Sequence, residues 1–304
     1  MWKYLLLLLL VPQFSIAEEL KIMTWNTYML PKPIKSSHQK QRSHAIADLL
    51  KKSDYDLVFL QEAFSPFFRR TLKHALKTKY PYYKRLKKKF GLYPIMGPGL
   101  IAYSKFPMEQ IDHVYYNKCS KADCHASKGV QLLEVTLPSG KRIQVANTHM
   151  QSGSDQKEAG IRSHQLDQVR KLLKDNNKSA VPQILVGDLN INSYKGTEFE
   201  NTLAMLQMNQ IMNDVVEQTE PEETSVETKP VIERIRDFFS AGFAVTCLKE
   251  GNESSPKLLD HVLYLEHDQK ITFKDDQIIF PEFELKGKMC PLSDHRPRVV
   301  TLEI

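Results

Sequence analysis

Short polar side chains recur in this sequence at the positions where apolar runs end. Seven of them carry an amide, a carboxylate or an imidazole: Asn26, Glu62, His149, Asp188, Asn190, Asp260 and His295. Taken alone, each is more often a turn, cap or surface residue. Burying all seven without mutual partners would be costly. The set therefore predicts one shared site that is hydrogen-bonded or metal-bound.

The residue types in this set indicate phosphate chemistry with a divalent cation. Oxygen ligands suit Mg²⁺. Glu62 is the natural carboxylate ligand, and Asn26 can add an amide oxygen or hold a metal-bound water. Mg²⁺ would pair with a substrate phosphate and stabilise the charge that develops on it. His149 and His295 can move protons, since neighbouring carboxylates tune an imidazole toward neutral pH.

Hydrophobic periodicity predicts the elements that would bring these residues together. Strands are expected at 20–25, 57–60, 100–104, 130–137, 142–148, 182–186, 258–265, 271–280 and 299–304, and helices at 41–52, 67–79, 163–176 and 197–208. The turn at Pro138-Ser139-Gly140 predicts an antiparallel hairpin between two of the strands. Strand ends converge in α/β folds, so distant residues can meet there. Strands and helices intermix without a repeat or linker, which favours one domain over residues 18–304.

Residues 1–17 have the features of a cleaved secretory signal peptide. Lys3 gives a positive start, 5–11 is an apolar run too short to span a bilayer, and Ser15-Ile16-Ala17 offers small residues for cleavage near Ala17. The alternative is an uncleaved anchor, which the short apolar run disfavours. We expect a secreted protein. The net charge of +6 suits a polyanionic or membrane surface without requiring one.

The four cysteines are Cys119, Cys124, Cys247 and Cys290. An even count in an exported protein favours disulfides. Three pairings are possible, and one of them, Cys119 with Cys124, would close a short loop. A zinc site is not expected, because these two cysteines lack a second closely spaced Cys or His pair.

Two further segments have unusual composition. Residues 82–90 are basic and aromatic, which is typical of a solvated rim or of a contact for anionic lipid or another phosphate-rich surface. Residues 217–229 are acidic, rich in threonine and poor in apolar side chains, which predicts a long exposed loop or a mobile lid.

Six short motifs, in this order, resemble those of the endonuclease/exonuclease/phosphatase superfamily, which has the DNase I-like fold: Trp25-Asn26-Thr27-Tyr28-Met29-Leu30, Leu60-Gln61-Glu62, Asn147-Thr148-His149, Gly187-Asp188-Leu189-Asn190, Leu259-Asp260-His261 and Ser293-Asp294-His295. The resemblance covers nearly the whole chain after residue 17. It implies an α/β (α+β) four-layer sandwich, in which two packed mixed β-sheets are flanked by helices.

Within that superfamily the chain looks most similar to the secreted bacterial neutral sphingomyelinases of the sphingomyelinase C group. Residues 26–30, 99–107, 127–129 and 162–166 carry this closer resemblance. It implies a monomeric phosphodiesterase that splits sphingomyelin into ceramide and phosphocholine at a membrane surface. The implied cofactor is Mg²⁺, with Mn²⁺ or Co²⁺ as substitutes, and no nucleic-acid partner is expected.

The resemblance also implies roles for the metal ligands and the general base. Glu62 would bind Mg²⁺ with help from Asn26. His295 would activate water for in-line attack on phosphorus, and Asp260 would orient it.

The remaining site residues would handle the phosphate. Asp188 and Asn190 would position the water and the phosphate oxygens, and His149 would stabilise those oxygens or assist the leaving group. Asp294 would lie beside this network, and Lys128 would contact substrate.

The sequence departs from the sphingomyelinase group just before its last motif. Members of that group carry a longer hairpin with tryptophan there, which is thought to dip into membranes, whereas residues 279–285 contain no tryptophan. Phe280 and Phe283 are either a reduced version of that hairpin or ordinary strand packing. The cysteine positions also do not reproduce the usual bridge of the group.

Three other functions stay open from the sequence. A secreted nuclease is compatible with the basic run Lys87-Lys88-Lys89. A phosphoinositide phosphatase would use the same scaffold. A non-catalytic protein that binds a host surface would keep the fold without the reaction.

Overall fold

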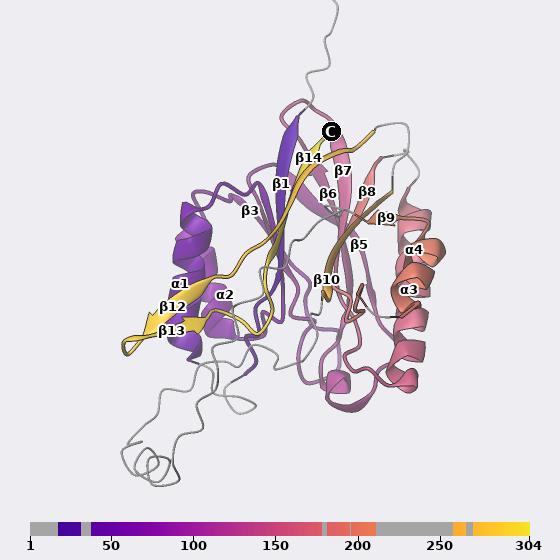
Figure 1. Cartoon of the computed structure of the whole chain (residues 1–304), viewed down its shortest axis with the longest axis horizontal. Helices are drawn as coiled ribbons and strands as arrows, with labels where there is room; N and C mark the ends of the chain where they lie inside the picture. The colour runs from indigo at the N-terminus through magenta and orange to yellow at the C-terminus, as the bar shows by residue number, and fades with distance from the viewer. Residues whose placement is uncertain (1–17, 32–37, 178–180, 195, 211–257, 266–269) are drawn as a thin grey trace, which may run out of the picture.

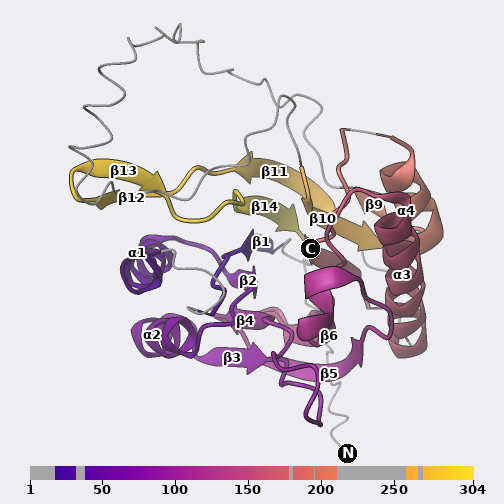
Figure 2. The same ribbon diagram turned by 90° about the horizontal axis from the view of Figure 1, so that it is seen from below.

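The computed structural model describes residues 18–31, 38–177, 181–194, 196–210, 258–265 and 270–304. Two mixed sheets pack face to face, and helices cover the outer face of each, so the layers run helix, sheet, sheet, helix (Figures 1 and 2). The predicted four-layer sandwich is therefore confirmed. Among the described residues, none of the helices is both long enough and apolar enough to cross a bilayer.

The first sheet has β1 and β2 near its centre. Its order is β11 (Thr272–Ile278), β14 (Arg298–Glu303), β1 (Glu19–Asn26), β2 (Leu57–Gln61), β4 (Ile101–Ser104) and β3 (Tyr82–Arg85). β1 and β2 are parallel, while β14 and β4 run antiparallel to them. The helices α1 (Gln39–Lys52) and α2 (Pro66–Leu76) bury their apolar faces against the outer side of this sheet (Figure 2).

The second sheet contains the other parallel pair. Its order is β5 (Met108–Tyr115), β6 (Gly129–Thr136), β7 (Arg142–His149), β8 (Gln183–Asp188), β10 (Asp260–Leu265) and β9 (Asn209–Gln210). β7 and β8 are parallel and are joined through α3 (Gln156–Asn176), which packs with α4 (Glu198–Leu206) on the outer side. The predicted hairpin at residues 130–148 is confirmed as β6 and β7.

Several features differ from the expectations, including the short strands β3 and β9. β5 was not expected, because a register shift between Gln110 and Asp112 breaks its alternation and leaves the apolar Ile111 exposed. Residues 282–291 form a separate hairpin of β12 (Glu282–Leu285) and β13 (Lys288–Pro291), which projects beside α1 (Figures 1 and 2). Asp260 begins a strand and does not end one. The segments 1–17 and 217–229 lie outside the described residues, so the signal peptide and the lid stay predictions.

Alternation along the strands carries polar side chains into the space between the sheets. Successive residues of a strand point to opposite faces. Ile22 of β1 and Val186 of β8 belong to the apolar core between the sheets. An even number of residues further on, the same faces end in Asn26 and Asp188. The core therefore turns polar at one edge of the sandwich.

Hydrogen bonds join the two sheets where the core turns polar. Gln61 Nε2 donates to Asn147 Oδ1 at 2.8 Å and to Thr24 Oγ1 at 3.1 Å. Asn147 Nδ2 donates to the carbonyl oxygen of Ile101 at 3.3 Å. These side chains are fully buried, so the bonds set the spacing of the sheets below the polar edge.

Replacing Asn147 with alanine should lower the free energy of unfolding by about 1–3 kcal/mol, because it removes a hydrogen-bond partner of Gln61 and of the Ile101 carbonyl in the core. Urea denaturation measures the change. Lys171→Ala, at an exposed position on α3, is the matched control and should stay within about 0.5 kcal/mol of the parent. Equal stability of Asn147→Ala and the parent would contradict this account of the interface.

Candidate active site

The polar residues predicted from the sequence meet at one edge of the sandwich. β1, β2, β7 and β8 end there, and the antiparallel strands β10 and β14 begin there. Asp260 therefore pairs directly with Asp188, and the loop before β14 brings in the last motif. Strand direction explains how residues from both ends of the chain reach one place.

Asp188 is the centre of the cluster. Its Oδ2 accepts a hydrogen bond from Asn26 Nδ2 at 2.9 Å and lies 3.5 Å from His149 Nε2 and 3.8 Å from His295 Nε2. Its Oδ1 accepts from the backbone N–H of Asn190 at 2.9 Å. Asp188 is only 1% exposed, so these partners compensate a buried carboxylate.

Gly187 makes this position of Asp188 possible. Its φ is +131°, and a Cβ there would lie 2.0 Å from the carbonyl oxygen of Thr148 on the neighbouring strand. Only glycine allows β7 and β8 to approach this closely. The close approach of the two strands thus explains why the Gly-Asp-Leu-Asn motif begins with glycine.

His295 and Asp260 form a hydrogen-bonded pair. His295 Nδ1 lies 2.7 Å from Asp260 Oδ2, which leaves Nε2 facing Asp188. Burial disfavours the charged imidazole, but Asp260 and Asp188 outweigh it and raise the pKa of His295 well above its ordinary value. The pair has the geometry of a general base held by a carboxylate.

The loop that carries His295 is fixed by hydrogen bonds to β1. Trp25 Nε1 donates to the carbonyl oxygen of His295 at 3.0 Å. Ser293 Oγ donates to the carbonyl oxygen of Asn26 at 2.7 Å, and it accepts from the N–H of His295 at 3.3 Å. Burial raises the pKa of the neighbouring Asp294 carboxyl. Ser293 and Trp25 are positioning residues that the sequence motifs contained without a stated role.

Glu62 has an unpaired oxygen suited to a cation. Its Oε1 accepts from Asn26 Nδ2 at 3.2 Å, whereas its Oε2 is buried without a hydrogen-bond partner. Burial raises the pKa of Glu62 to about 7. Its φ is +52°, which is uncommon for a non-glycine residue and turns the chain directly after β2. A cation would compensate this buried carboxyl.

Glu62 can serve as a carboxylate ligand of Mg²⁺. Within the described ranges, no group of three or more His, Cys, Asp and Glu side chains is arranged to hold a metal ion. Mg²⁺ usually takes one or two carboxylates and completes its shell with water and substrate phosphate. Glu62 Oε2 can fill that place. The Asn26 amide nitrogen faces Glu62 and Asp188, so Asn26 acts in this arrangement by holding both carboxylates.

His149 lies beside a buried lysine. Lys128 Nζ is 3.0 Å from His149 Nε2, donates to the carbonyl oxygen of Met150 at 2.7 Å and pairs with Asp123 Oδ2 at 2.9 Å. Burial and the Lys128 charge lower the pKa of His149 to about 3, so its imidazole is neutral. Lys128 therefore lies against His149 at the site, and its contact with substrate stays a prediction.

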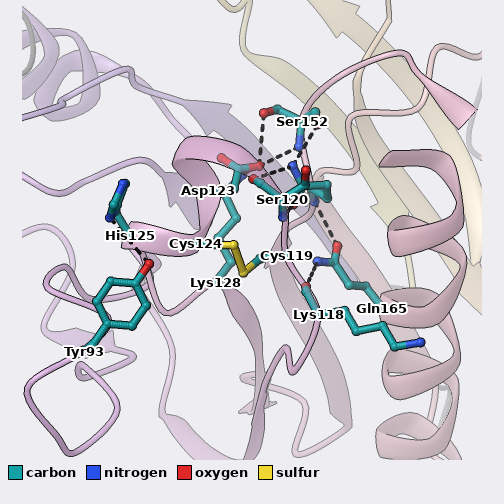
Figure 3. The surroundings of a disulfide bond; sticks show 11 residues. Tyr93, Lys118, Cys119, Ser120, Asp123, Cys124, His125, Lys128, Ser152 and Gln165 are labelled. Carbon is teal, nitrogen blue, oxygen red and sulfur yellow. Dashed lines mark hydrogen bonds and ion pairs between the residues drawn. A yellow bond between two sulfur atoms is a disulfide. The ribbon is translucent and has the colours of Figure 1, made fainter. Parts of the chain in front are cut away.

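A disulfide closes the short loop that contains Asp123 and precedes Lys128. Cys119 and Cys124 are bonded, which is one of the pairings left open by the sequence, and Cys290 is also in a disulfide. Asp123 Oδ2 accepts from the N–H of Ser152 at 2.7 Å (Figure 3). The ion pair between Lys128 and Asp123 was not predicted from the sequence, because it depends on the contact that holds Asp123 against Ser152.

Arg42 was also not foreseen as part of the site's support. Its side chain is buried, and it donates to the carbonyl oxygens of Leu292 at 2.7 Å, Tyr28 at 3.1 Å and Thr27 at 2.5 Å. It thus ties α1 to the loops that follow β1 and precede β14. The only sequence signal was its place one turn before Ile46 on the apolar face of α1.

Comparison with known proteins agrees with this architecture. The model of the Endonuclease/Exonuclease/phosphatase family matches residues 23–264. The chain is similar to Sphingomyelinase C 2 of Leptospira interrogans, at 28% identity over 63% of this chain and 34% of that protein. It is also similar to an inositol phosphosphingolipids phospholipase C of Schizosaccharomyces pombe, at 28% identity over 58% and 42%. The chain thus spans less than half the length of these two relatives.

Solved structures share the fold at lower identity. A beta toxin mutant from Staphylococcus aureus with bound magnesium ions has a TM-score of 0.67 at 20% identity, and the match covers 93% of this chain and 99% of that one. D. rerio TDP2 with a single-strand DNA product has a TM-score of 0.60 at 16% identity, covering 94% and 99%. The predicted likeness to the superfamily, and within it to sphingomyelinase C, is confirmed.

Replacing Asp260 with asparagine should lower the pKa of the His295 imidazole, because the substitution removes the charge that most favours its protonated form. NMR titration of the imidazole in metal-free protein measures the shift. Asp167→Asn, on the exposed face of α3, is the control and should leave the His295 pKa in place. An unchanged His295 pKa in Asp260→Asn would contradict the proposed pairing.

Proposed function

The chain belongs to the endonuclease/exonuclease/phosphatase family, and on that premise we propose that it is a secreted, Mg²⁺-dependent phosphodiesterase that hydrolyses sphingomyelin to ceramide and phosphocholine. The observation that carries the proposal is the His295–Asp260 pair, which faces Asp188 in the same cluster as the buried, unpaired carboxyl oxygen of Glu62. The likeness to sphingomyelinase C supports the choice of substrate. Secretion is supported by the composition of residues 1–17 and by the disulfides.

His295 acts as the general base in the proposed reaction. Its Nε2 removes a proton from water, the water oxygen attacks phosphorus, and the bond between phosphorus and the ceramide oxygen breaks. Asp260 holds the opposite ring nitrogen and stabilises the imidazolium that forms. The imidazolium returns its proton to solvent and the leaving ceramide oxygen takes up a proton from water, so phosphocholine and ceramide are the two products.

Lys128, His149 and Asn190 surround the place where the phosphate binds. The Lys128 ammonium and the neighbouring imidazole of His149 stabilise the phosphate oxygens. Asn190 Nδ2 donates to the carbonyl oxygen of Met150 at 3.2 Å, which fixes its amide beside Asp188. A divalent cation held by Glu62 would further stabilise the negative charge on the phosphate oxygens.

A second candidate substrate has an anionic head group. The relative from Schizosaccharomyces pombe is named for inositol phosphosphingolipids. In this chain, basic residues from α2 and β3 line a groove of about 510 Å³. That charge favours an anionic head group over phosphocholine and makes an inositol phosphosphingolipid the alternative to test.

Purified protein should release phosphocholine from sphingomyelin in the presence of Mg²⁺ and stop when the metal is chelated. His295→Ala should reduce the rate on the order of 10²–10⁴-fold, because the proton acceptor is lost. Glu62→Gln should raise the Mg²⁺ concentration needed for half-maximal rate by at least about tenfold. His164→Ala, at the exposed face of α3, is the control and should keep the parent rate.

No phosphocholine from folded protein at any metal concentration would refute the choice of substrate. Inositol phosphosphingolipid and plasmid DNA, assayed in parallel, separate the alternatives: release of phosphoinositol or nicking of DNA would assign the site to that substrate. A non-catalytic binding protein would keep its affinity for its target in His295→Ala, whereas an enzyme would lose its rate of hydrolysis.

A further inference from the structure

We propose that the loop of residues 86–99 docks onto a phospholipid bilayer that contains anionic lipid. The loop joins β3 to β4 and presents large apolar side chains to solvent. Phe90 is 102% exposed and Leu92 is 96% exposed, and Ile95 is also well exposed. Such a group of apolar side chains on a surface marks a contact with a partner or a membrane.

Cations surround the apolar tip. Lys87, Lys88 and Lys89 are exposed directly before Phe90, and none of them forms an ion pair with an acidic residue in the described part of the chain. The adjoining groove is lined mostly by basic side chains and by no acidic one: Pro66, Arg69, Arg70, Lys73, Tyr83, Lys84, Arg85 and Lys87. This charge is complementary to lipid phosphates.

The base of the loop is anchored, so the apolar tip is held away from the body. Met96 donates from its N–H to the carbonyl oxygen of His125 at 3.0 Å, and its own carbonyl oxygen accepts from the N–H of Ser127 at 3.0 Å. Tyr115 Oη donates to the carbonyl oxygen of Lys87 at 2.8 Å. The ring of Tyr93 packs edge-on against His125 beside the disulfide (Figure 3).

The loop lies at the same edge as the candidate active site. The carbonyl oxygen of its last residue, Gly99, accepts a hydrogen bond from the N–H of Ala63 at 2.9 Å, and a Cβ on Gly99 would lie 3.1 Å from the Cα of Glu62. Ser127, which holds the base of the loop, directly precedes Lys128. A bilayer bound by this loop would therefore lie close to the residues that bind substrate.

The combination of side chains favours a bilayer over other anionic partners. Nucleic acids are bound through cations and through stacking on aromatic rings, which gives no role to Leu92 and Ile95. Interfacial membrane segments combine basic residues with both aromatic and aliphatic ones. The inference deepens the proposed function and rests on it, since a lipid substrate must be met at a surface, but docking can be measured without turnover.

The test is binding to vesicles that contain no sphingomyelin, in the presence of chelator. Vesicles of phosphatidylcholine with phosphatidylserine should bind the protein more tightly than vesicles of phosphatidylcholine alone. The triple variant Phe90→Ser, Leu92→Ser, Ile95→Ser should bind at least about tenfold more weakly. Replacing Lys87, Lys88 and Lys89 with glutamine should weaken binding to the anionic vesicles on the order of fivefold for each lysine. Ile111→Ser, an exposed apolar residue on β5, is the control and should bind as the parent does.

A second readout uses Leu92→Trp, whose emission should shift to shorter wavelength when anionic vesicles are added. Of the two native tryptophans, Trp25 is fully buried and should not respond, and Trp2 is removed by using protein that starts after residue 17. Parent-like binding by the triple serine variant, an unshifted emission, or preference for single-stranded DNA over vesicles would each overturn the proposal. Thermal unfolding of the variants confirms that they fold. Because these measurements need no hydrolysis, they give their answer whether or not sphingomyelin is the substrate.

Discussion

The buried carboxylate of Asp188 is the interaction on which the rest of the site depends. A charge that is almost fully removed from water must be compensated by partners of the right kind. The structure supplies an amide from β1, a backbone N–H, and two imidazoles at longer distance. Since these groups come from both sheets, the sandwich has to close at this edge for the charge to be stabilised.

The surroundings of Asp188 give its two histidines opposite properties. Burial and Lys128 lower the pKa of His149 to about 3, whereas at His295 burial is outweighed by Asp260 and Asp188, which raise its pKa. One imidazole is therefore neutral beside a cation, whereas the surroundings of the other stabilise the imidazolium that a general base becomes when it takes a proton. Pairs of titratable groups whose environments separate their pKa values in this way are typical of acid–base sites.

The segments around the edge are tied to the site by few but direct contacts. The segment after the disulfide loop places Lys128 against His149, and its residues His125 and Ser127 hold the base of the 86–99 loop. Arg42 joins the loops after β1 and before β14. A bilayer that binds at this edge would therefore contact segments that are already joined to the residues of the candidate active site.

Residue type and spacing predicted one domain, most of its strands and helices and a shared polar site, whereas the four-layer sandwich was implied by the resemblance of the six motifs to the superfamily. Strand alternation and the polar residues at the strand ends place Asn26 and Asp188 on the face that forms the core. These are local properties of the chain, so they could be found before any contact between distant segments was known.

Which groups face one another, in contrast, followed from the assembled sandwich alone. The direction of β10 puts Asp260 at the start of its strand and opposite Asp188, and the ion pair of Lys128 with Asp123 joins the disulfide-closed segment to β7. The exposure of Phe90 and the projection of the β12–β13 hairpin also depend on what packs nearby. Contacts between distant segments are set by how sheets and loops assemble, and no local pattern of residues encodes that assembly.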